Sequence, residues 1–211
     1  MLSLALAISM AAPAQAGAAY LAGVGWVAQT LNNCGPASVI AATSAYGIAF
    51  DQRELAKILK AKPTGYMTAD VIDPFLRPYG LRAQRYKEGD IWHIKRLIDQ
   101  GIPVIVLQYL DRVGGIPHFR TVRGYDDATQ VIWFSDSMYG ANSYLSYQDF
   151  DRLWNIYNRE FIPIFPEGYQ ATVSRAVNPA IASAQVAAGG SVPKTSVPKT
   201  SAPKTNSTPK R

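Results

Sequence analysis

QTLNNCGPAS, residues 29–38, contains the only cysteine of the chain and opens an apolar run that reaches Gly47. Asn33 is placed to cap a helix by accepting a hydrogen bond from an early backbone N–H. Pro36 would fall in the first turn, where its missing N–H costs nothing. Gly47 then marks the helix end, because glycine readily adopts the left-handed conformation found there. The stretch therefore predicts a helix that begins at or just after Cys34.

This position gives the Cys34 thiol two alternative roles. At a helix N-terminus, unpaired N–H groups and the helix dipole favour a thiolate. Gln29, five residues earlier, carries a side-chain amide that can donate hydrogen bonds. A thiol and a nearby amide are two parts of a cysteine acyl-transfer site. The alternative is a small apolar cysteine packed in a core, where most free cysteines lie, and the local sequence does not decide between the two.

The N-terminus carries the features of a secretory signal. Residues 2–16 are apolar and end in Ala14-Gln15-Ala16, the A-x-A pattern that precedes signal-peptide cleavage. We therefore expect residues 1–16 to be a signal peptide and the mature protein to begin near Gly17 and to be exported, either periplasmic or secreted. The segment has no Lys or Arg at its start, and a buried N-terminal helix is the alternative. An exported chain with one cysteine forms no internal disulfide, which favours a reactive Cys34.

The positive charge is concentrated at the C-terminal end. The net charge is +6, yet residues 171–211 hold six basic residues and no acidic ones. The rest of the chain is formally neutral, so the sequence gives no evidence of a nucleic-acid groove. Two SVPKT repeats followed by SAPKT predict that residues 170–211 form a disordered Pro/Lys-rich tail. The tail could be an inert spacer or could attach the protein to an anionic cell-surface polymer.

The remaining sequence, residues 17–169, predicts one domain with helices first and an antiparallel sheet after them. No apolar run downstream of the N-terminal segment is long enough to span a bilayer. The order of elements indicates an α+β fold. Pro163 suggests that the last strand lies at a sheet edge, because proline cannot donate to a ladder. We expect further helices at residues 51–61, 68–80, 90–100 and 146–157, and strands at residues 103–110, 118–125, 130–136 and 161–165.

The chain has only two histidines, so only two residues are candidates for the histidine that pairs with Cys34. His93 falls inside a predicted helix, where a surface or packing role is the simplest interpretation. His118 opens a predicted strand, and Asp136 closes the next strand of the same hairpin. A short turn would bring these two ends level, so that Asp136 could orient the His118 imidazole. Taken alone, Asp136 would be read as a residue that caps the following turn.

The order of these motifs resembles a known family. A glutamine, then CGPAS at a helix start, then His-aromatic in a strand followed by GYDD, then Asp at the end of the next strand is similar to the bacteriocin-processing cysteine peptidases. It also resembles their stand-alone peptidase-like relatives in the papain superfamily. The later SYQDFDRLW is similar to the family's next helix, and the resemblance covers roughly residues 20–167.

The resemblance implies a papain-like fold and roles for four residues. Cys34 would be the nucleophile, His118 the general base and acid, Asp136 the orienting residue, and Gln29 part of the oxyanion hole. Gln29 precedes the cysteine by five residues, where six is more usual in the superfamily. Asp136 is followed by Ser137, where proline is common. Transporter-linked members continue into membrane helices and an ATPase that this sequence lacks, so a double-glycine leader is not implied as the substrate.

These observations predict an exported cysteine peptidase that hydrolyses a peptide or protein substrate through a thioester acyl-enzyme. The reaction requires no metal or organic cofactor, and one cysteine with two separated histidines argues against a structural zinc site. Two alternatives remain. An amine could intercept the acyl-enzyme, which would make the protein an acyl or peptide transferase. The fold could also serve as a non-catalytic module that binds peptides or cell-wall stems.

Overall fold

The computed structural model describes residues 17–178, so the predicted signal peptide and residues 179–211 of the predicted tail lie outside the described residues. Short 3-10 turns flank α3 and precede α6. The helices and strands are β1 (Ala18–Tyr20), α1 (Cys34–Ser44), α2 (Gln52–Leu59), α3 (Ile72–Leu76), β2 (Leu81–Ala83), α4 (Ile91–Asp99), β3 (Val104–Tyr109), β4 (Pro117–Asp126), β5 (Val131–Asp136), β6 (Gly140–Ser146), α5 (Tyr147–Leu153), β7 (Phe161–Pro166) and α6 (Gln170–Val177).

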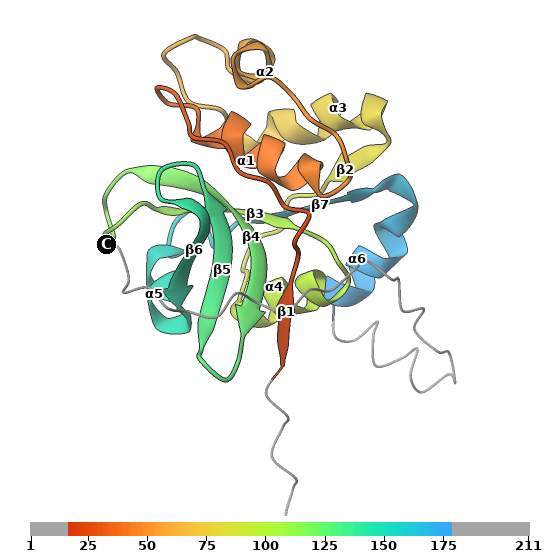
Figure 1. Cartoon of the computed structure of the whole chain (residues 1–211), viewed down its shortest axis with the longest axis vertical. Coiled ribbons are helices and arrows are strands. Elements are labelled where there is room, and N and C mark those ends of the chain that lie inside the picture. The colour runs from red at the N-terminus through yellow and green to blue at the C-terminus, as the bar shows by residue number, and fades with distance from the viewer. Residues whose placement is uncertain (1–16, 179–211) are drawn as a thin grey trace, which may run out of the picture.

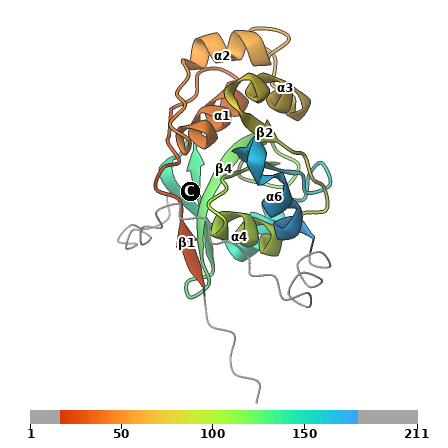
Figure 2. The same ribbon diagram turned by 90° about the vertical axis from the view of Figure 1, so that its right-hand side faces the viewer.

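An antiparallel sheet forms the middle of the molecule. Its strand order is β2-β7-β3-β4-β5-β6, and β1 pairs with β4. Side chains alternate across β3, so Val104 and Val106 join a core cluster with α4, whereas Ile105 and Leu107 join a second cluster with α1, α2 and α3. Figures 1 and 2 show α1, α2 and α3 gathered at the top of the molecule and α4 and α6 at its other end.

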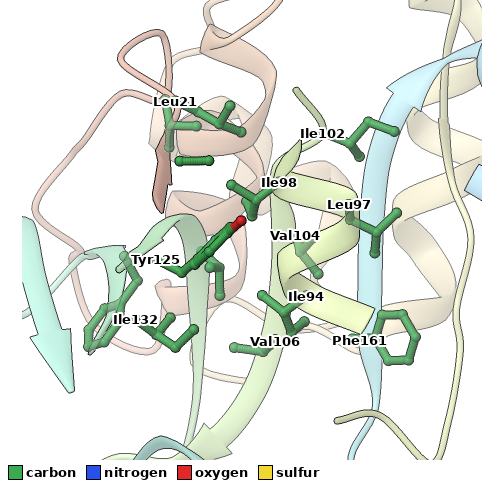
Figure 3. Close-up of a cluster of buried hydrophobic side chains, with 14 of the residues drawn as sticks. Leu21, Ile94, Leu97, Ile98, Ile102, Val104, Val106, Tyr125, Ile132 and Phe161 are labelled. Carbon is green, nitrogen blue, oxygen red and sulfur yellow. The ribbon is translucent and has the colours of Figure 1, made fainter. Parts of the chain in front are cut away.

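Helix α4 illustrates how local sequence sets the packing. Its start is fixed by the Asp90 side chain, which accepts a hydrogen bond of 2.9 Å from the His93 N–H. Ile94, Leu97 and Ile98 recur on one face and are fully buried against the sheet, as Figure 3 shows. The helix predicted at residues 90–100 is therefore confirmed.

Helix α1 is surrounded by protein. Nine of its eleven residues are buried, which is expected of a helix that is apolar and small on every side. A side-chain hydrogen bond ties it to the sheet, because Thr121 Oγ1 in β4 donates to the Ser38 carbonyl at 2.9 Å. The N-terminal end of α1, where Cys34 lies, is thus held in a fixed position relative to β4.

The predicted edge position of Pro163 is wrong, because β7 lies between β2 and β3. The ladder tolerates the proline for a local reason. Phe161 N–H donates towards Tyr86 on the β2 side, and N–H groups alternate along a strand, so the missing N–H of Pro163 faces that side too. Strand β2 pairs only as far as Ala83, and the place opposite Pro163 lies in the gap before Tyr86.

The predicted start of the tail at residue 170 is also too early. Residues Gln170–Val177 form α6, in which Val173 and Ala176 are buried in the core cluster around α4. Arg96 of α4 donates hydrogen bonds to the carbonyls of Ala176 and Arg175, which fixes the helix to the domain. The composition of this helix resembles that of the residues after it, so a change in composition gave no sign of the boundary.

Strand β6 is not among the strands predicted from the sequence, and its last residue, Ser146, was predicted to open a helix. Its sequence, GANSYLS, is polar, and its residues are mostly half-exposed. A polar sequence is typical of an edge strand, and β6 lies at the edge of the sheet beside β5. None of the helices within residues 17–178 combines the length and the hydrophobicity that crossing a bilayer requires.

Candidate active site

Cys34 is the first residue of α1, as predicted, and its side chain is buried. The sulfur is within hydrogen-bond reach of the His118 side chain and of the backbone N–H groups of Phe119 and Gly35. Packing favours a glycine at position 35, since a Cβ there would lie 2.8 Å from Met67 Cβ. The start of α1 therefore presents the Cys34 sulfur to β4 and surrounds it with hydrogen-bond donors.

The predicted contact between His118 and Asp136 is present. His118 Nε2 lies 3.0 Å from Asp136 Oδ1, which leaves Nδ1 as the ring nitrogen that faces Cys34. The pairing of Thr121 with Ser135 brings the ends of β4 and β5 together, as the short turn between them predicted. Asp136 is completely buried, and its Oδ1 also accepts the N–H of Met138 at 2.8 Å. Cys34, His118 and Asp136 thus form one continuous hydrogen-bonded chain.

The surroundings of the pair favour charge separation. Burial alone would raise the pKa of the Cys34 thiol, but the hydrogen bond and the charge of His118 outweigh it and lower that pKa. Burial alone would lower the pKa of His118, but hydrogen bonds to Asp136 and Cys34 raise it. The pKa of Asp136 is held far below its usual range by His118 and Arg120 despite burial. Both shifts favour a Cys34 thiolate beside a His118 imidazolium.

Arg120 is a buried residue of this site that the sequence reading did not single out. Its Nε donates to Asp136 Oδ2 at 2.7 Å, and its NH1 donates to Gln108 Oε1 at 3.1 Å. The side chain is 2 % exposed. The sequence could have predicted this position, because Arg120 follows His118 by two residues and side-chain alternation places both on the same face of β4. Arg120 fixes the second oxygen of Asp136, so that the first is aimed at His118.

Asn33 occupies the cap position before α1 but makes no side-chain capping bond, contrary to the prediction. Its side chain is used elsewhere. Asn33 Oδ1 accepts a hydrogen bond of 2.7 Å from Lys60 Nζ, and its Nδ2 donates to Thr30 Oγ1 at 2.7 Å. Lys60 is a buried residue at the end of α2, and it interacts electrostatically with Cys34. A positive charge therefore lies beside the residue that precedes the thiol.

Gln29 is half-buried and lies next to the end of β5. Its Oε1 accepts a hydrogen bond of 2.8 Å from Ser137 Oγ, and its backbone N–H donates to the Ser137 carbonyl at 3.1 Å. These two bonds orient the side chain and leave the Nε2 amide as its donor group. Trp26 also connects the loop before α1 to the end of β5, because its Nε1 donates to the Asp136 carbonyl at 2.6 Å.

His93 lies away from this site, in the capping box of α4. Its Nδ1 accepts the N–H of Asp90 at 3.3 Å, and its ring lies 5.4 Å from the Phe161 ring. These are contacts of a residue that packs and caps, as the sequence suggested. Within residues 17–178, no group of three or more His, Cys, Asp and Glu side chains is arranged to hold a metal ion.

Comparison with known proteins gives the relationship of the chain. The family model described as "Peptidase_C39 like family" matches residues 21–161, which is more than half of the sequence. The chain belongs to this family. The match runs from the residue after β1 to the first residue of β7 and includes Cys34, His118 and Asp136. No protein with curated annotation matches the chain significantly.

Solved structures share the fold of this C39-like protein at low sequence identity. A proposed C39-like peptidase from Bacillus anthracis has a TM-score of 0.58 and 14% identity, over 71% of this chain and 98% of that one. The peptidase domain of Streptococcus ComA, a bifunctional ABC transporter of a quorum-sensing pathway, has a TM-score of 0.53 and 17% identity, over 68% and 98%. A double-glycine motif protease from an AMS/PCAT transporter, crystallised with its leader peptide, has a TM-score of 0.54 and 17% identity, over 70% and 94%.

These likenesses confirm the predicted α+β papain-like fold and the resemblance to the bacteriocin-processing peptidases. The family relationship supports a function of the cysteine peptidase type.

Proposed function

We propose that the protein is an exported cysteine peptidase that hydrolyses peptide bonds with Cys34 as its nucleophile. The observation that carries the proposal is the buried hydrogen-bonded chain from Cys34 in α1 through His118 in β4 to Asp136 in β5. A thiolate held beside an imidazolium is a nucleophile and a proton donor in one unit. Asp136 acts as a positioning residue, because its bond to Nε2 fixes the ring with Nδ1 towards the sulfur.

The reaction follows from these contacts. The Cys34 sulfur attacks the carbonyl carbon of the scissile bond, and the carbonyl oxygen becomes an oxyanion. The backbone N–H of Cys34 and the Gln29 Nε2 amide are the donors proposed to stabilise it. His118 Nδ1 gives its proton to the leaving amine as the C–N bond breaks, which leaves a thioester. His118 then takes a proton from water, the hydroxide attacks the thioester, and the carboxylic product and the Cys34 thiolate are released.

A peptide is the substrate class that the relatives favour. The double-glycine motif protease was crystallised with a leader peptide, which supports a peptide as the substrate class. The test is a mass-spectrometric screen of a peptide library with the wild type and with Cys34→Ala. Cleavage products with the wild type alone would support the proposal. Products from both proteins would point to a contaminating peptidase, and products from neither would favour a non-catalytic binding module.

Adding an amine to the same screen separates hydrolysis from acyl transfer. A peptidase releases a free carboxyl group whether or not the amine is present. A transferase would join the amine to the peptide, and the product would gain the corresponding mass. A dominant amide product would overturn hydrolysis as the main reaction while keeping the acyl-enzyme.

Lys60 gives this site a prediction of its own. Its ammonium is held against Asn33, next to the thiol, and Cys34 is the titrating group with which it interacts. Lys60→Met should move the pH profile of Cys34 alkylation to higher pH. Loss of one nearby charge should slow alkylation at neutral pH by roughly twofold to tenfold. His118, the other charged group that acts on Cys34, remains in the variant.

Lys60→Arg is the matched control because it keeps the charge. It should retain a profile close to that of the wild type. If both variants shift the profile equally, the packing at the end of α2 is responsible and the charge of Lys60 plays no part. Iodoacetamide alkylation followed by intact-mass measurement between pH 4 and pH 10 provides the comparison, a range of about two units beyond the ordinary histidine and cysteine values.

A further inference from the structure

Gly17 and Asp127 hold each other through two hydrogen bonds. Gly17 N–H donates to Asp127 Oδ2 at 3.0 Å, and Asp127 N–H donates to the Gly17 carbonyl at 2.9 Å. Little space remains beside the glycine, since a Cβ there would lie 3.2 Å from Tyr125 Oη and 3.4 Å from Asp127 Oδ2. Asp127 therefore encloses the backbone nitrogen that stands at the start of β1.

The surroundings of Asp127 suit an additional positive charge. Its carboxylate accepts hydrogen bonds from Lys95 Nζ at 2.6 and 2.7 Å and from Tyr147 Oη at 2.7 Å. Asp126 lies next to it in the chain, and Asp99 interacts with Tyr125, which adjoins the same place. A second cation beside Asp127 Oδ2 would be attracted by the same carboxylate that binds Lys95.

The sequence places a cleavage pattern directly before this nitrogen. Ala14-Gln15-Ala16 precedes Gly17, and hydrolysis after Ala16 would convert the Gly17 N–H into an α-amino group. We infer that removal of the signal peptide creates a Gly17 α-ammonium that is bound by Asp127, so that processing completes an ion pair at the start of the domain. This inference does not depend on the chemistry proposed for Cys34.

The covalent step is an ordinary peptide hydrolysis. A signal peptidase of the export machinery adds water across the Ala16–Gly17 bond, and Ala16 leaves with the new carboxyl group on the released peptide. The Gly17 nitrogen takes up protons to become an ammonium at neutral pH. Its position beside Asp127 is already set by the pairing of β1 with β4, so the ion pair forms without rearrangement of the domain.

Anchoring of Gly17 would stabilise β1 and the segment that continues from it towards the candidate active site. Strand β1 is only three residues long, and its pairing with β4 is therefore weak by itself. The Gly17–Asp127 pair fixes the residue directly before the strand. The chain continues from β1 to Trp26, which bonds to the Asp136 carbonyl. A processed N-terminus anchored in this way is part of the framework that leads to the candidate site.

The test uses the full chain expressed in an exporting host and recovered after export. Intact mass and N-terminal sequencing should show that the mature protein begins at Gly17. The pKa of its α-amino group is then measured from the pH dependence of competitive labelling with an amine-directed reagent. Pairing with Asp127 should raise this pKa above the ordinary α-amino range of about 7.7–8.0.

Asp127→Asn should return the α-amino pKa to the ordinary range. Asp126→Asn is the matched control, because Asp126 accepts hydrogen bonds from its own turn and not from Gly17. A mature chain that begins elsewhere would overturn the inference, and so would an unshifted pKa in the wild type. The wild-type pKa decides the question by itself if Asp127→Asn fails to fold, since that variant also loses the contacts with Lys95 and Tyr147.

Discussion

Replacing Cys34 by alanine is expected to abolish peptide hydrolysis and alkylation while leaving the protein folded. No other thiol exists in the chain, so loss of the Cys34 sulfur removes the only nucleophile of this kind. The structural cost should be small, because alanine keeps Cβ and suits a helix start inside a cluster of small residues. Loss of one buried sulfur should cost about 1 kcal/mol, which corresponds to about 2–4 °C in Tm for a domain of this size.

Two measurements separate catalysis from packing in this variant. Turnover of a cleaved library peptide should fall to background, and circular dichroism should give a melting curve close to that of the wild type. Cys34→Ser is the matched control, since its hydroxyl keeps a hydrogen-bonding group beside His118 but has a far higher pKa. If Cys34→Ala unfolds the protein and Cys34→Ser restores both stability and turnover, Cys34 is a packing residue and the proposed nucleophile is wrong.

The contact between His118 and Asp136 could be predicted from the sequence because it is local. Both residues belong to one hairpin whose short turn brings the ends of β4 and β5 together, although the register shifts between Val122 and Gly124, between the turn and the contact. The start of α1 at Cys34 could be predicted for the same reason, since Pro36 and the apolar run lie within the helix itself. Only the resemblance to a peptidase family predicted that Cys34 lies beside the His118–Asp136 pair, because no spacing rule places α1 against β4.

Contacts between segments that are distant in the sequence could not be predicted from local patterns. Lys60 reaches Asn33 from the end of α2, 27 residues away in the chain, and nothing in either segment indicates the partner. Pro163 lies in an inner strand because β2, which has only three residues, leaves a gap opposite it. Only the burial of Val173 and Ala176 against α4 shows that helix α6 belongs to the domain.

Arg120 also changes what is expected of Asp136→Asn. From the sequence this substitution would cause a mild loss of activity, because the imidazole would remain and only its orientation would suffer. The structure adds a buried guanidinium bonded to the second oxygen of Asp136. The amide would leave that charge unpaired in the interior, at a cost of about 3–5 kcal/mol. Loss of stability should therefore accompany loss of activity, and a melting curve beside each rate would reveal it.

Replacing His118 by alanine should reduce turnover by roughly three orders of magnitude or more, because a nucleophile–base pair acts as a unit. The same change should alter the reactivity of the thiol. His118 is the group whose hydrogen bond and charge lower the pKa of Cys34 against the effect of burial. Without it, alkylation at neutral pH should slow, and its midpoint should rise to or above the ordinary thiol value of about 8.5.

His93→Ala is the matched histidine control for this measurement. His93 lies in the capping box of α4, so its loss should cost a fraction of a helix cap, about 0.5–1 kcal/mol, and leave the alkylation profile unchanged. The sign follows from the direction of each shift: His118 lowers the pKa of Cys34, and Cys34 and Asp136 raise the pKa of His118, so loss of His118 moves formation of the thiolate to higher pH. Alkylation should therefore begin at lower pH in the wild type and in His93→Ala than in His118→Ala. A profile that shifts in His93→Ala and not in His118→Ala would place the base of the reaction in α4 and would exclude the proposed pair.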